Sequence, residues 1–287
     1  MFPTSDPLVT VAHLRSLAQL GGPGPESVRV RLLDVRWELG RDDCYRQYRD
    51  GHIPGAVFAN LDHDLAAAPS PAAGRHPLPS LEALQDAARR WGINQGEAVV
   101  AYDAVGNLAA ARLWWVLRDA GFTDVHLLDG ALAAWQAAGY PLQRGAVDVP
   151  PGNAVLGPQG QMPQIGLEQA AGFAAAGGLL LDARAPERFR GDSEPVDPRA
   201  GHIPGAKSAP TGENLTADGH FRPAAALRAR FEALGAAPGR PIASYCGSGV
   251  TAAHQVFALE LAGFQAALYP GSWSQWAASD RPAATGD

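Results

Sequence analysis

The sequence predicts an α/β protein built from two copies of one domain, each a parallel sheet with helices on both faces. The first observation is a repeat, because Gly51-His-Ile-Pro-Gly-Ala56 recurs as Gly201-His-Ile-Pro-Gly-Ala206. The second is the pattern around each copy, in which short continuous apolar runs alternate with longer helical stretches. Continuous apolar strands separated by helices are typical of parallel sheets that are covered on both faces.

Six apolar runs are expected to form the strands of the two sheets. They are Val28–Leu33, Ala98–Tyr102 and Val125–Leu128 in the first half, and Leu179–Leu181, Ile242–Tyr245 and Ala267–Tyr269 in the second. Three helices are expected at Ser80–Trp91, Leu108–Ala120 and Pro223–Leu234. In sheets of this kind ligands bind beyond the carboxyl ends of strands, so the residues that follow these runs are candidate site residues.

Other matching segments occur in the same order in both halves, which indicates a duplicated domain. Before each Gly-His-Ile-Pro-Gly motif an apolar run ends in Asp-x-Arg, at Leu32–Arg36 and at Leu180–Arg184. We expect a first domain over residues 1–143 and a second over residues 161–287, each of an ordinary size. Residues 144–160 are rich in Pro and Gly and lack a sustained period, so they are expected to be a linker.

Composition argues against several kinds of partner. The formal net charge is −6 and the basic residues are scattered, so neither nucleic acid nor an anionic membrane surface is an expected partner. No segment is long enough to span a bilayer, and Met1–Pro7 lacks the pattern of a leader peptide, so we expect a cytoplasmic protein. The two cysteines, Cys44 and Cys246, have none of the spacing of a metal site or a disulfide framework.

Cys246 is the strongest candidate for a catalytic nucleophile, because it lies between the end of a predicted strand and the start of a predicted helix. It follows the apolar run Pro241–Tyr245 and opens Cys246-Gly-Ser-Gly-Val-Thr-Ala252. The glycines allow the backbone to curl with several N–H groups pointing inward, and the following helix adds its positive end, so the loop can cradle an anion. A thiol at such a place is expected to be nucleophilic. The alternative is a buried structural cysteine, which gains nothing from such a loop.

Cysteine loops of this general shape also serve phosphatases, in which an arginine that closes the loop clamps the phosphate. Residues 247–253 contain no arginine, so the loop favours a persulfide, whose terminal sulfur can lie among the N–H groups. Cys44 stands in a polar helical stretch without a glycine loop and is expected to be a bystander. His52 and His202 are expected to be structural, because the half that lacks the cysteine loop also keeps the motif.

The loop Cys246–Ala252 resembles the active-site loop of the two-domain sulfurtransferases of the rhodanese superfamily, and within it that of the 3-mercaptopyruvate sulfurtransferases. The first copy carries Asp103 at the position of the nucleophile, so only the second copy can do thiol chemistry. The resemblance implies two tandem rhodanese-like domains that move sulfur from 3-mercaptopyruvate to a thiol or cyanide through a Cys246 persulfide, releasing pyruvate. It implies no metal and no organic cofactor. A thioredoxin-like protein is one candidate acceptor.

The side chains within the loop bear on the identity of the sulfur donor. Thiosulfate-type rhodaneses place Arg and Lys directly after the cysteine, whereas this chain has Gly247 and Ser248 and so resembles the mercaptopyruvate type. The resemblance implies that Gly247, Gly249, Val250 and Thr251 help to bind the substrate. Two alternatives stay open. One is a thiosulfate sulfurtransferase that uses the same cysteine, and the other is a non-catalytic carrier that delivers the persulfide sulfur to a dedicated protein.

A 2-keto acid donor also requires a clamp for its carboxylate. By resemblance Arg188 and Arg199 are the substrate-binding arginines of this clamp, with Arg190 as a rival for either role.

The donor further requires a means of moving a proton. The resemblance implies a Ser-His-Asp arrangement in which Ser248 belongs to the cysteine loop, while His76 and Asp62 come from the first domain. The active site is then expected to be a crevice between the two domains.

Overall fold

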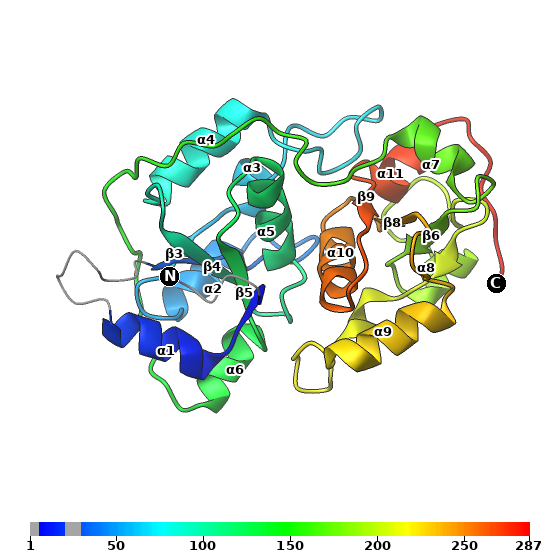
Figure 1. Cartoon of the computed structure of the whole chain (residues 1–287). Helices are drawn as coiled ribbons and strands as arrows, with labels where there is room; N and C mark the ends of the chain where they lie inside the picture. The colour runs from blue at the N-terminus through cyan, green and yellow to red at the C-terminus, as the bar shows by residue number, and fades with distance from the viewer. Residues whose placement is uncertain (1–5, 21–29) are drawn as a thin grey trace. The chain divides into compact units, whose positions relative to one another are not determined.

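The computed structural model describes residues 6–20 and 30–287, which divide into two compact units (Figure 1). Unit 1 comprises the described residues up to Leu65, together with Pro79–Gln161 and Ala217–Phe221. Unit 2 comprises Ala66–Leu78, Met162–Thr216 and Arg222–Asp287, so it includes a loop from the first half of the sequence. Residues 28 and 29 of the first expected strand, and most of the N-terminal segment that argues against a leader, lie outside the described residues.

Unit 1 is built on a sheet whose described strands are all parallel, in the order β1-β5-β4-β2-β3. The strands are β1 (Leu8–Val9), β2 (Val30–Asp34), β3 (Val57–Phe58), β4 (Ala98–Tyr102) and β5 (Val125–Leu128). The helices are α1 (Val11–Leu20), α2 (Cys44–Asp50), α3 (Leu61–Asp64), α4 (Leu81–Arg90), α5 (Ala110–Asp119) and α6 (Ala131–Ala137).

Unit 2 repeats this plan with a parallel sheet in the order β7-β6-β8-β9. Its strands are β6 (Leu179–Asp182), β7 (Lys207–Ser208), β8 (Ile242–Tyr245) and β9 (Ala267–Leu268). Its helices are α7 (Leu167–Phe173), α8 (Pro186–Arg190), the 3-10 helix η1 (Thr211–Asn214), α9 (Ala224–Ala233), α10 (Thr251–Leu261) and α11 (Ser272–Ala277). The sequence therefore predicted three strands of each sheet, and the structure adds the two-residue strands β1, β3 and β7.

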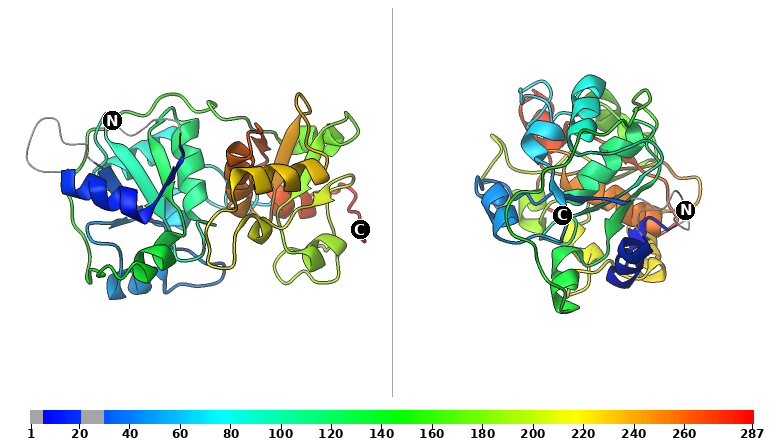
Figure 2. Two further views of the ribbon diagram at one scale, coloured as in Figure 1. Left: turned by 60° about the horizontal axis from the view of Figure 1, so that its bottom comes forward. Right: turned by 90° about the vertical axis from the view of Figure 1, so that its left-hand side faces the viewer.

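Both faces of the sheet in unit 1 are covered, because the side chains of its strands alternate between two layers of helices. Val100 and Tyr102 of β4 belong to a core cluster with Leu14 of α1 and Trp135 of α6. Helix α5 contacts β4 and β5, and it lies on the face opposite α1 and α6 (Figures 1 and 2).

Unit 2 is layered in the same way. Its cluster joins Leu180 of β6 and Tyr245 of β8 to Phe189 of α8 and to Trp273 and Trp276 of α11. Helix α10 contacts β8 and β9. The predicted α/β class, two parallel sheets with helices, is confirmed.

The Asp-x-Arg and Gly-His-Ile-Pro-Gly motifs join the strand ends within each unit. In unit 2 the buried Asp182 binds Arg184 at 2.7 Å, and Arg184 Nη2 donates to the carbonyl of Gly201 at 2.6 Å. The hydroxyl of Tyr245, the last residue of β8, accepts the N–H of Ile203 at 3.1 Å. The same set of contacts recurs in unit 1 between Asp34, Arg36, Gly51, Ile53 and Tyr102. These contacts fix the residues that follow β4 and β8.

The two repeated histidines have the structural role that the sequence predicts. His202 Nδ1 lies 2.8 Å from the carbonyl oxygen of Phe189, and its ring stacks on the Phe189 ring. His52 Nδ1 lies 2.9 Å from the carbonyl oxygen of Tyr48 and stacks on that ring. Since a carbonyl can only accept, each ring donates through Nδ1–H and is held by its motif.

Residues 144–160, all within the described part of the chain, form neither helix nor strand. They are hydrogen-bonded along unit 1, where the N–H groups of Gly145 and Gly152 donate to the carbonyls of Arg49 and Arg89 at 2.8 Å. A Cβ on Gly152 would stand 1.9 Å from the Ile93 carbonyl oxygen, so only glycine allows this approach.

The exact boundaries of the two predicted domains stay a prediction. Among the described residues, none of the helices combines the length and apolar character that a membrane span requires.

Candidate active site

Cys246 is the first residue after β8 in unit 2, and α10 begins at Thr251. The thiol is buried, with 2% of the residue exposed, and Sγ accepts the N–H of Gly249 at 3.1 Å. Val250, also buried, is the last residue before the helix. The loop therefore curls back over its own cysteine, as the sequence predicts, and aims a backbone donor at the sulfur.

Gly249 is required by the shape of this loop. Its φ is +81°, and a Cβ at this position would stand 2.4 Å from the carbonyl oxygen of Pro270. Both the left-handed backbone and the close approach exclude a side chain. The turn that contains Pro270 thus forms one wall of the cysteine loop.

The segment that follows Pro270 holds the loop through hydrogen bonds to its backbone. The N–H of Cys246 donates to Ser272 Oγ at 3.1 Å, and the carbonyl of Cys246 accepts the N–H of Trp273 at 2.9 Å. The carbonyl of Gly247 accepts the N–H of Ser274 at 2.9 Å. These three bonds fix the nucleophile and its neighbour in one geometry.

Ser248 and His76 are brought together within unit 2. Ser248 Oγ and His76 Nδ1 lie 2.7 Å apart and share a hydrogen bond whose direction depends on the histidine tautomer. Ser248 is buried, and His76 is half-buried. The two residues are 172 positions apart in the sequence, so this pair depends on the packing of residues 66–78 into unit 2.

The loop that carries His76 is tied to the same segment as the cysteine loop. Gly74 has a φ of +88°, and a Cβ there would stand 2.7 Å from the Gly271 carbonyl oxygen. The next residue, Arg75, donates its N–H to Ser274 Oγ at 3.1 Å. Since Ser274 also binds Gly247, one serine links the two loops.

Arg75 itself belongs to the site, although the sequence did not single it out. Its Nη2 lies 2.9 Å from the place that a Cβ of Gly247 would occupy. Its Nη1 forms an ion pair with Asp197, whose side chain is 3% exposed. The only signal in the sequence is its position directly before His76.

Arg188 is the predicted clamp residue that the structure brings to the loop. Its Nη1 lies 3.5 Å from the Cβ place of Gly247, and its Nη2 donates to Glu194 at 2.6 Å and to Asp197 at 3.1 Å. Asp197 therefore bridges Arg75 and Arg188. Two guanidinium groups and two carboxylates form one half-buried cluster beside the residue that follows Cys246.

The two carboxylates of this cluster differ in acidity. Burial acts to raise the pKa of Glu194, but the hydrogen bonds from Arg188 and from the N–H groups of Asp197 and Val196 outweigh it, so the pKa is lowered. Burial raises the pKa of Asp197, and the charge of Glu194 adds to this effect, more than Arg75 and Arg188 lower it. Glu194 is thus the firmly ionised partner of the two.

The other two arginines of the predicted clamp have different surroundings. Arg199 donates four hydrogen bonds of 2.8–3.0 Å to the backbone carbonyls of Trp276, Ala277, Ser279 and Arg281. This arginine therefore organises the chain after α11. Arg190 pairs at 2.8 Å with an exposed aspartate, Asp192, and its own side chain is 38% exposed.

Asp62, the predicted third member of the Ser-His-Asp arrangement, lies in unit 1. It is in the first turn of α3, and its carboxylate accepts a hydrogen bond of 2.9 Å from Trp37 Nε1. Its partnership with His76 stays a prediction.

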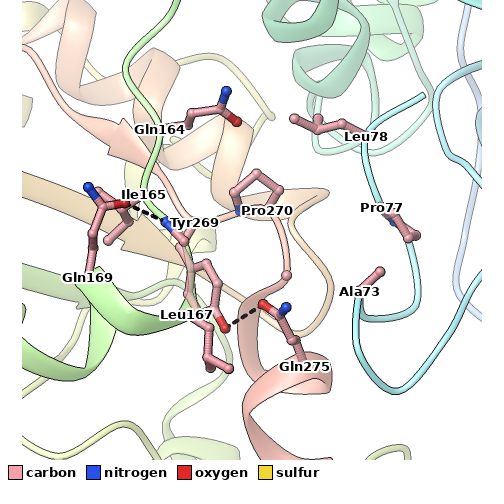
Figure 3. Close-up of a pocket in the computed structure, with 12 residues that line it drawn as sticks. Ala73, Pro77, Leu78, Gln164, Ile165, Leu167, Gln169, Tyr269, Pro270 and Gln275 are labelled. Atoms are coloured by element: carbon pink, nitrogen blue, oxygen red, sulfur yellow. Dashed lines mark hydrogen bonds between the residues drawn. The ribbon is translucent and has the colours of Figure 1, made fainter. Parts of the chain in front are cut away.

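A cavity of about 370 Å³ in unit 2 borders the loop that carries His76 (Figure 3). Ala73, Pro77 and Leu78 line one wall of it, and Gln275 of α11 lines another. Tyr269 donates its hydroxyl to Gln275 Oε1 at 2.7 Å. Neither Cys246 nor the glycines of its loop belong to the lining, so the cavity is a neighbour of the thiol site.

The chain is similar to known proteins over most of its length. Residues 20–138 and 167–279 match the family model of the Rhodanese-like domain. The chain is 45% identical over 281 residues to the "Putative thiosulfate sulfurtransferase SseB" of Mycobacterium tuberculosis, covering 97% of each chain. It is 47% identical over 265 residues to the "Probable 3-mercaptopyruvate sulfurtransferase" of Pseudomonas aeruginosa, covering 89% of this chain and 92% of that relative.

Solved structures give the same result. The crystal structure of SseA from Escherichia coli superposes with a TM-score of 0.78 at 33% identity, covering 94% of this chain and 99% of SseA. The crystal structure of the Tum1 protein from Saccharomyces cerevisiae superposes with a TM-score of 0.84 at 26% identity, covering 98% of each chain. With both halves matched by the family model, the chain belongs to the family of the Rhodanese-like domain, as a protein with two copies of it.

Proposed function

We propose that this protein is a sulfurtransferase that moves sulfur from 3-mercaptopyruvate to a thiol or cyanide through a persulfide on Cys246, releasing pyruvate. One observation carries the proposal: three consecutive loop residues each have a partner suited to one part of this reaction. Cys246 Sγ faces the N–H of Gly249, Gly247 faces guanidinium groups, and Ser248 binds His76. Relatives named 3-mercaptopyruvate sulfurtransferase support the choice of donor.

In the first half-reaction the Cys246 thiolate attacks the sulfur of mercaptopyruvate. A bond forms between Sγ and that sulfur, while the carbon–sulfur bond breaks and its electron pair passes to the carbon, giving the enolate of pyruvate. The enolate takes up one proton and leaves as pyruvate. The N–H of Gly249, which donates to Cys246 Sγ, stabilises the charge on the persulfide.

His76 and Ser248 manage protons in this step. Their 2.7 Å hydrogen bond gives a path between the imidazole and the hydroxyl next to the nucleophile. We assign to this pair the movement of the thiol proton of the donor and the protonation of the leaving enolate. Asp62 is proposed as the orienting carboxylate for His76.

In the second half-reaction a thiolate or cyanide attacks the terminal sulfur of the persulfide. The sulfur–sulfur bond breaks, the Cys246 thiolate is restored, and the product is a new persulfide or thiocyanate. A thioredoxin-like acceptor and a cytoplasmic location are further parts of this proposal. They stay predictions.

Arg188 is the proposed clamp for the donor carboxylate, because its Nη1 lies beside Gly247 and, unlike Nε and Nη2, makes no hydrogen bond to Glu194 or Asp197. Arg199 is the weaker candidate, since its donors already bind four carbonyls. Gly249 and Val250 shape the loop, and Thr251 begins the helix whose positive end faces it.

Thiosulfate is the second candidate donor, favoured by the 45% identity to a relative named for thiosulfate. The two candidates are separated by measuring kcat/KM for both donors with cyanide as acceptor. Mercaptopyruvate is expected to be the better donor, with one pyruvate released for each thiocyanate. A protein that prefers thiosulfate would have the other function. Steady turnover with small thiols excludes a carrier, which would load one sulfur and stall.

The nucleophile is tested by locating the transferred sulfur. After incubation with mercaptopyruvate, mass spectrometry should find one added sulfur on Cys246, and Cys246→Ser should be inactive. Cys44→Ser is the matched control and should remain active, because burial raises the pKa of the Cys44 thiol and leaves less of it as thiolate. Sulfur found mainly on Cys44 would contradict the assignment.

A further inference from the structure

Residues 66–78 carry His76 and form a loop of unit 2 with hydrogen bonds of its own. The N–H of Ala67 donates to the carbonyl of Pro77 at 3.0 Å, which joins the two ends of the loop. Residues 70–74 form a turn closed by two hydrogen bonds of 3.1 and 2.8 Å between its end residues. Because the loop is bonded to itself in this way, the place of the His76 imidazole depends on where the loop is attached to the rest of the unit.

Ser274 attaches this loop directly beside His76. Its Oγ accepts the backbone N–H of Arg75 at 3.1 Å and donates its own proton to the carbonyl of Gly271 at 3.1 Å. The bond to Gly271 fixes the hydroxyl proton, so a lone pair of the oxygen is left for the Arg75 N–H. Since Ser274 is buried, water does not compete for this attachment.

The same serine also holds the cysteine loop, but through its backbone. The N–H of Ser274 donates to the carbonyl of Gly247 at 2.9 Å. Gly247 lies between Cys246 and Ser248, and Ser248 Oγ is 2.7 Å from His76 Nδ1. Ser274 therefore connects both partners of this hydrogen bond. Because the two connections use different atoms, removal of the hydroxyl affects the His76 side and leaves the bond to the cysteine loop in place.

Gln275 attaches the loop at a second point. Its Nε2 donates to the carbonyl of Ala72 at 2.5 Å, and its Oε1 accepts the hydroxyl of Tyr269 at 2.7 Å (Figure 3). A carbonyl can only accept, so the two contacts require the same orientation of the amide. Between the two attachments the backbone passes so close to Ser274 that a Cβ on Gly74 would stand 2.8 Å from Ser274 Oγ.

We infer that Ser274 is a positioning residue for the proton-handling step, because its hydroxyl sets the place of His76 relative to Ser248. The inference rests on the proposed function and adds to it a residue that acts through His76. A proton moves along a hydrogen bond only while its two heavy atoms stay within reach, so a small shift of the loop is enough to slow the step. The Ser274 hydroxyl should therefore matter for a donor that brings a proton and not for one that brings none.

The test compares mercaptopyruvate with thiosulfate, because only mercaptopyruvate brings a thiol proton to be moved at neutral pH. Wild type, Ser274→Ala, His76→Ala and the double variant are assayed with each donor by the limiting single-turnover rate of persulfide formation. Ser272→Ala is the matched control. Ser272 is also buried, but its hydroxyl accepts the N–H of Cys246 at 3.1 Å, so it holds the nucleophile and not the loop of His76.

Ser274→Ala should lower the rate with mercaptopyruvate about tenfold, while the rate with thiosulfate stays within about twofold of wild type. In the His76→Ala background the same substitution should change the mercaptopyruvate rate by less than about twofold, because the residue that it positions is gone. Ser272→Ala should instead lower the rates with both donors by a similar factor, and its effect should persist in the His76→Ala background.

Equal losses with both donors in Ser274→Ala would overturn the inference, since they would mean that Ser274 only supports the fold or the cysteine loop. An unchanged rate with mercaptopyruvate would overturn it too, as would losses that multiply in the double variant. If Ser274→Ala does not fold, Gly74→Ala disturbs the same contact from the other side and should show the same donor-selective loss. Failure of the proposed function is distinct, because it would appear in the wild type as no pyruvate released from mercaptopyruvate.

Discussion

Asp103 and Cys246 occupy equivalent places at the carboxyl ends of β4 and β8, each directly after a tyrosine whose hydroxyl accepts a backbone N–H of the repeated motif. The Asp103 carboxylate accepts four backbone N–H groups at 2.8–3.2 Å. In unit 1 the loop therefore closes around a carboxyl group, whose pKa is raised because burial outweighs the hydrogen bonds from the loop N–H groups. In unit 2 the same kind of loop encloses a thiol, and the loop is suited to hold negative charge on sulfur when a persulfide forms.

The half-buried cluster of Arg75, Arg188, Glu194 and Asp197 beside Gly247 predicts a pH dependence of stability. The hydrogen bonds to Glu194 lower its pKa below the value in the unfolded chain, so the folded state prefers the ionised form. This stabilisation is complete above the unfolded pKa and is lost as the pH falls through the lower folded pKa. Glu194→Gln should therefore cost about 1–3 kcal/mol near neutral pH, measured by urea unfolding. The difference from wild type should shrink as the pH falls below about 4.5; a difference that grows on acidification would contradict this account.

Gly249 and Gly247 make a matched pair of substitutions with different expected effects. Gly249→Ala should lower the free energy of unfolding by about 1–3 kcal/mol and abolish activity, because its φ is +81° and the Pro270 carbonyl blocks a Cβ. Gly247→Ala meets only the flexible end of Arg75 at 2.9 Å, so it should change stability by less than about 1 kcal/mol.

The effect of Gly247→Ala should appear in donor binding instead. Displacement of the Arg75 guanidinium should raise the mercaptopyruvate KM while kcat changes little, because Arg75 shares Asp197 with the proposed clamp residue Arg188. Thermal unfolding and steady-state kinetics on both variants separate the two cases. Equal destabilisation of the two proteins would show that Gly247 is constrained by the backbone and not by Arg75.

Substitution of Arg188 is expected to weaken donor binding, whereas substitution of Arg199 is expected to lower the stability of the fold. Arg188→Lys keeps the charge but not the paired donors, so the mercaptopyruvate KM should rise about tenfold. Arg199→Lys leaves backbone carbonyls of Trp276–Arg281 without donors, so it should lower stability by about 1–3 kcal/mol and leave KM near wild type. If Arg199→Lys instead raised KM without loss of stability, the clamp would belong to Arg199.

The fold could be predicted because buried parallel strands leave continuous apolar runs, and because the repeat gives two independent copies of each signal. The strands β1, β3 and β7 were not among the predicted runs, because a two-residue strand leaves little pattern and β7 consists of the polar pair Lys207–Ser208. The equally short β9 was predicted because Tyr269 extends its apolar run. Cys246 and its loop were recognisable from local sequence alone, because glycines next to a strand end determine the backbone there.

Arg75 could not be predicted in the same way. A single arginine in a polar loop has no local pattern, and its place depends on the packing of residues 66–78 into unit 2. For Arg199 the resemblance implies a role in substrate binding. In the structure, however, its guanidinium donates to backbone carbonyls at and after the end of α11. Local sequence patterns therefore do not predict side chains whose role in the site depends on tertiary contacts.

The pair of Ser248 and His76 predicts a loss of activity that depends on the donor. Mercaptopyruvate brings a thiol proton and leaves as an enolate that must be protonated, whereas thiosulfate has no proton to move at neutral pH. Ser248→Ala and His76→Ala should each lower kcat for mercaptopyruvate about 100-fold or more. Residual activity with thiosulfate should fall far less. Asp62→Asn should give the same donor-selective loss if Asp62 orients His76.

The double variant Ser248→Ala/His76→Ala distinguishes a proton-handling pair from two separate structural roles. Because the two side chains share one hydrogen bond of 2.7 Å, removing either breaks the path, and the double variant should be within about threefold of the poorer single variant. Thermal unfolding of all three proteins serves as the control for folding. If Ser248 only braced the loop and His76 only packed against it, both donors would suffer alike and the two losses would multiply. That result would remove the pair from the chemistry and leave Cys246 and the arginines as its remaining participants.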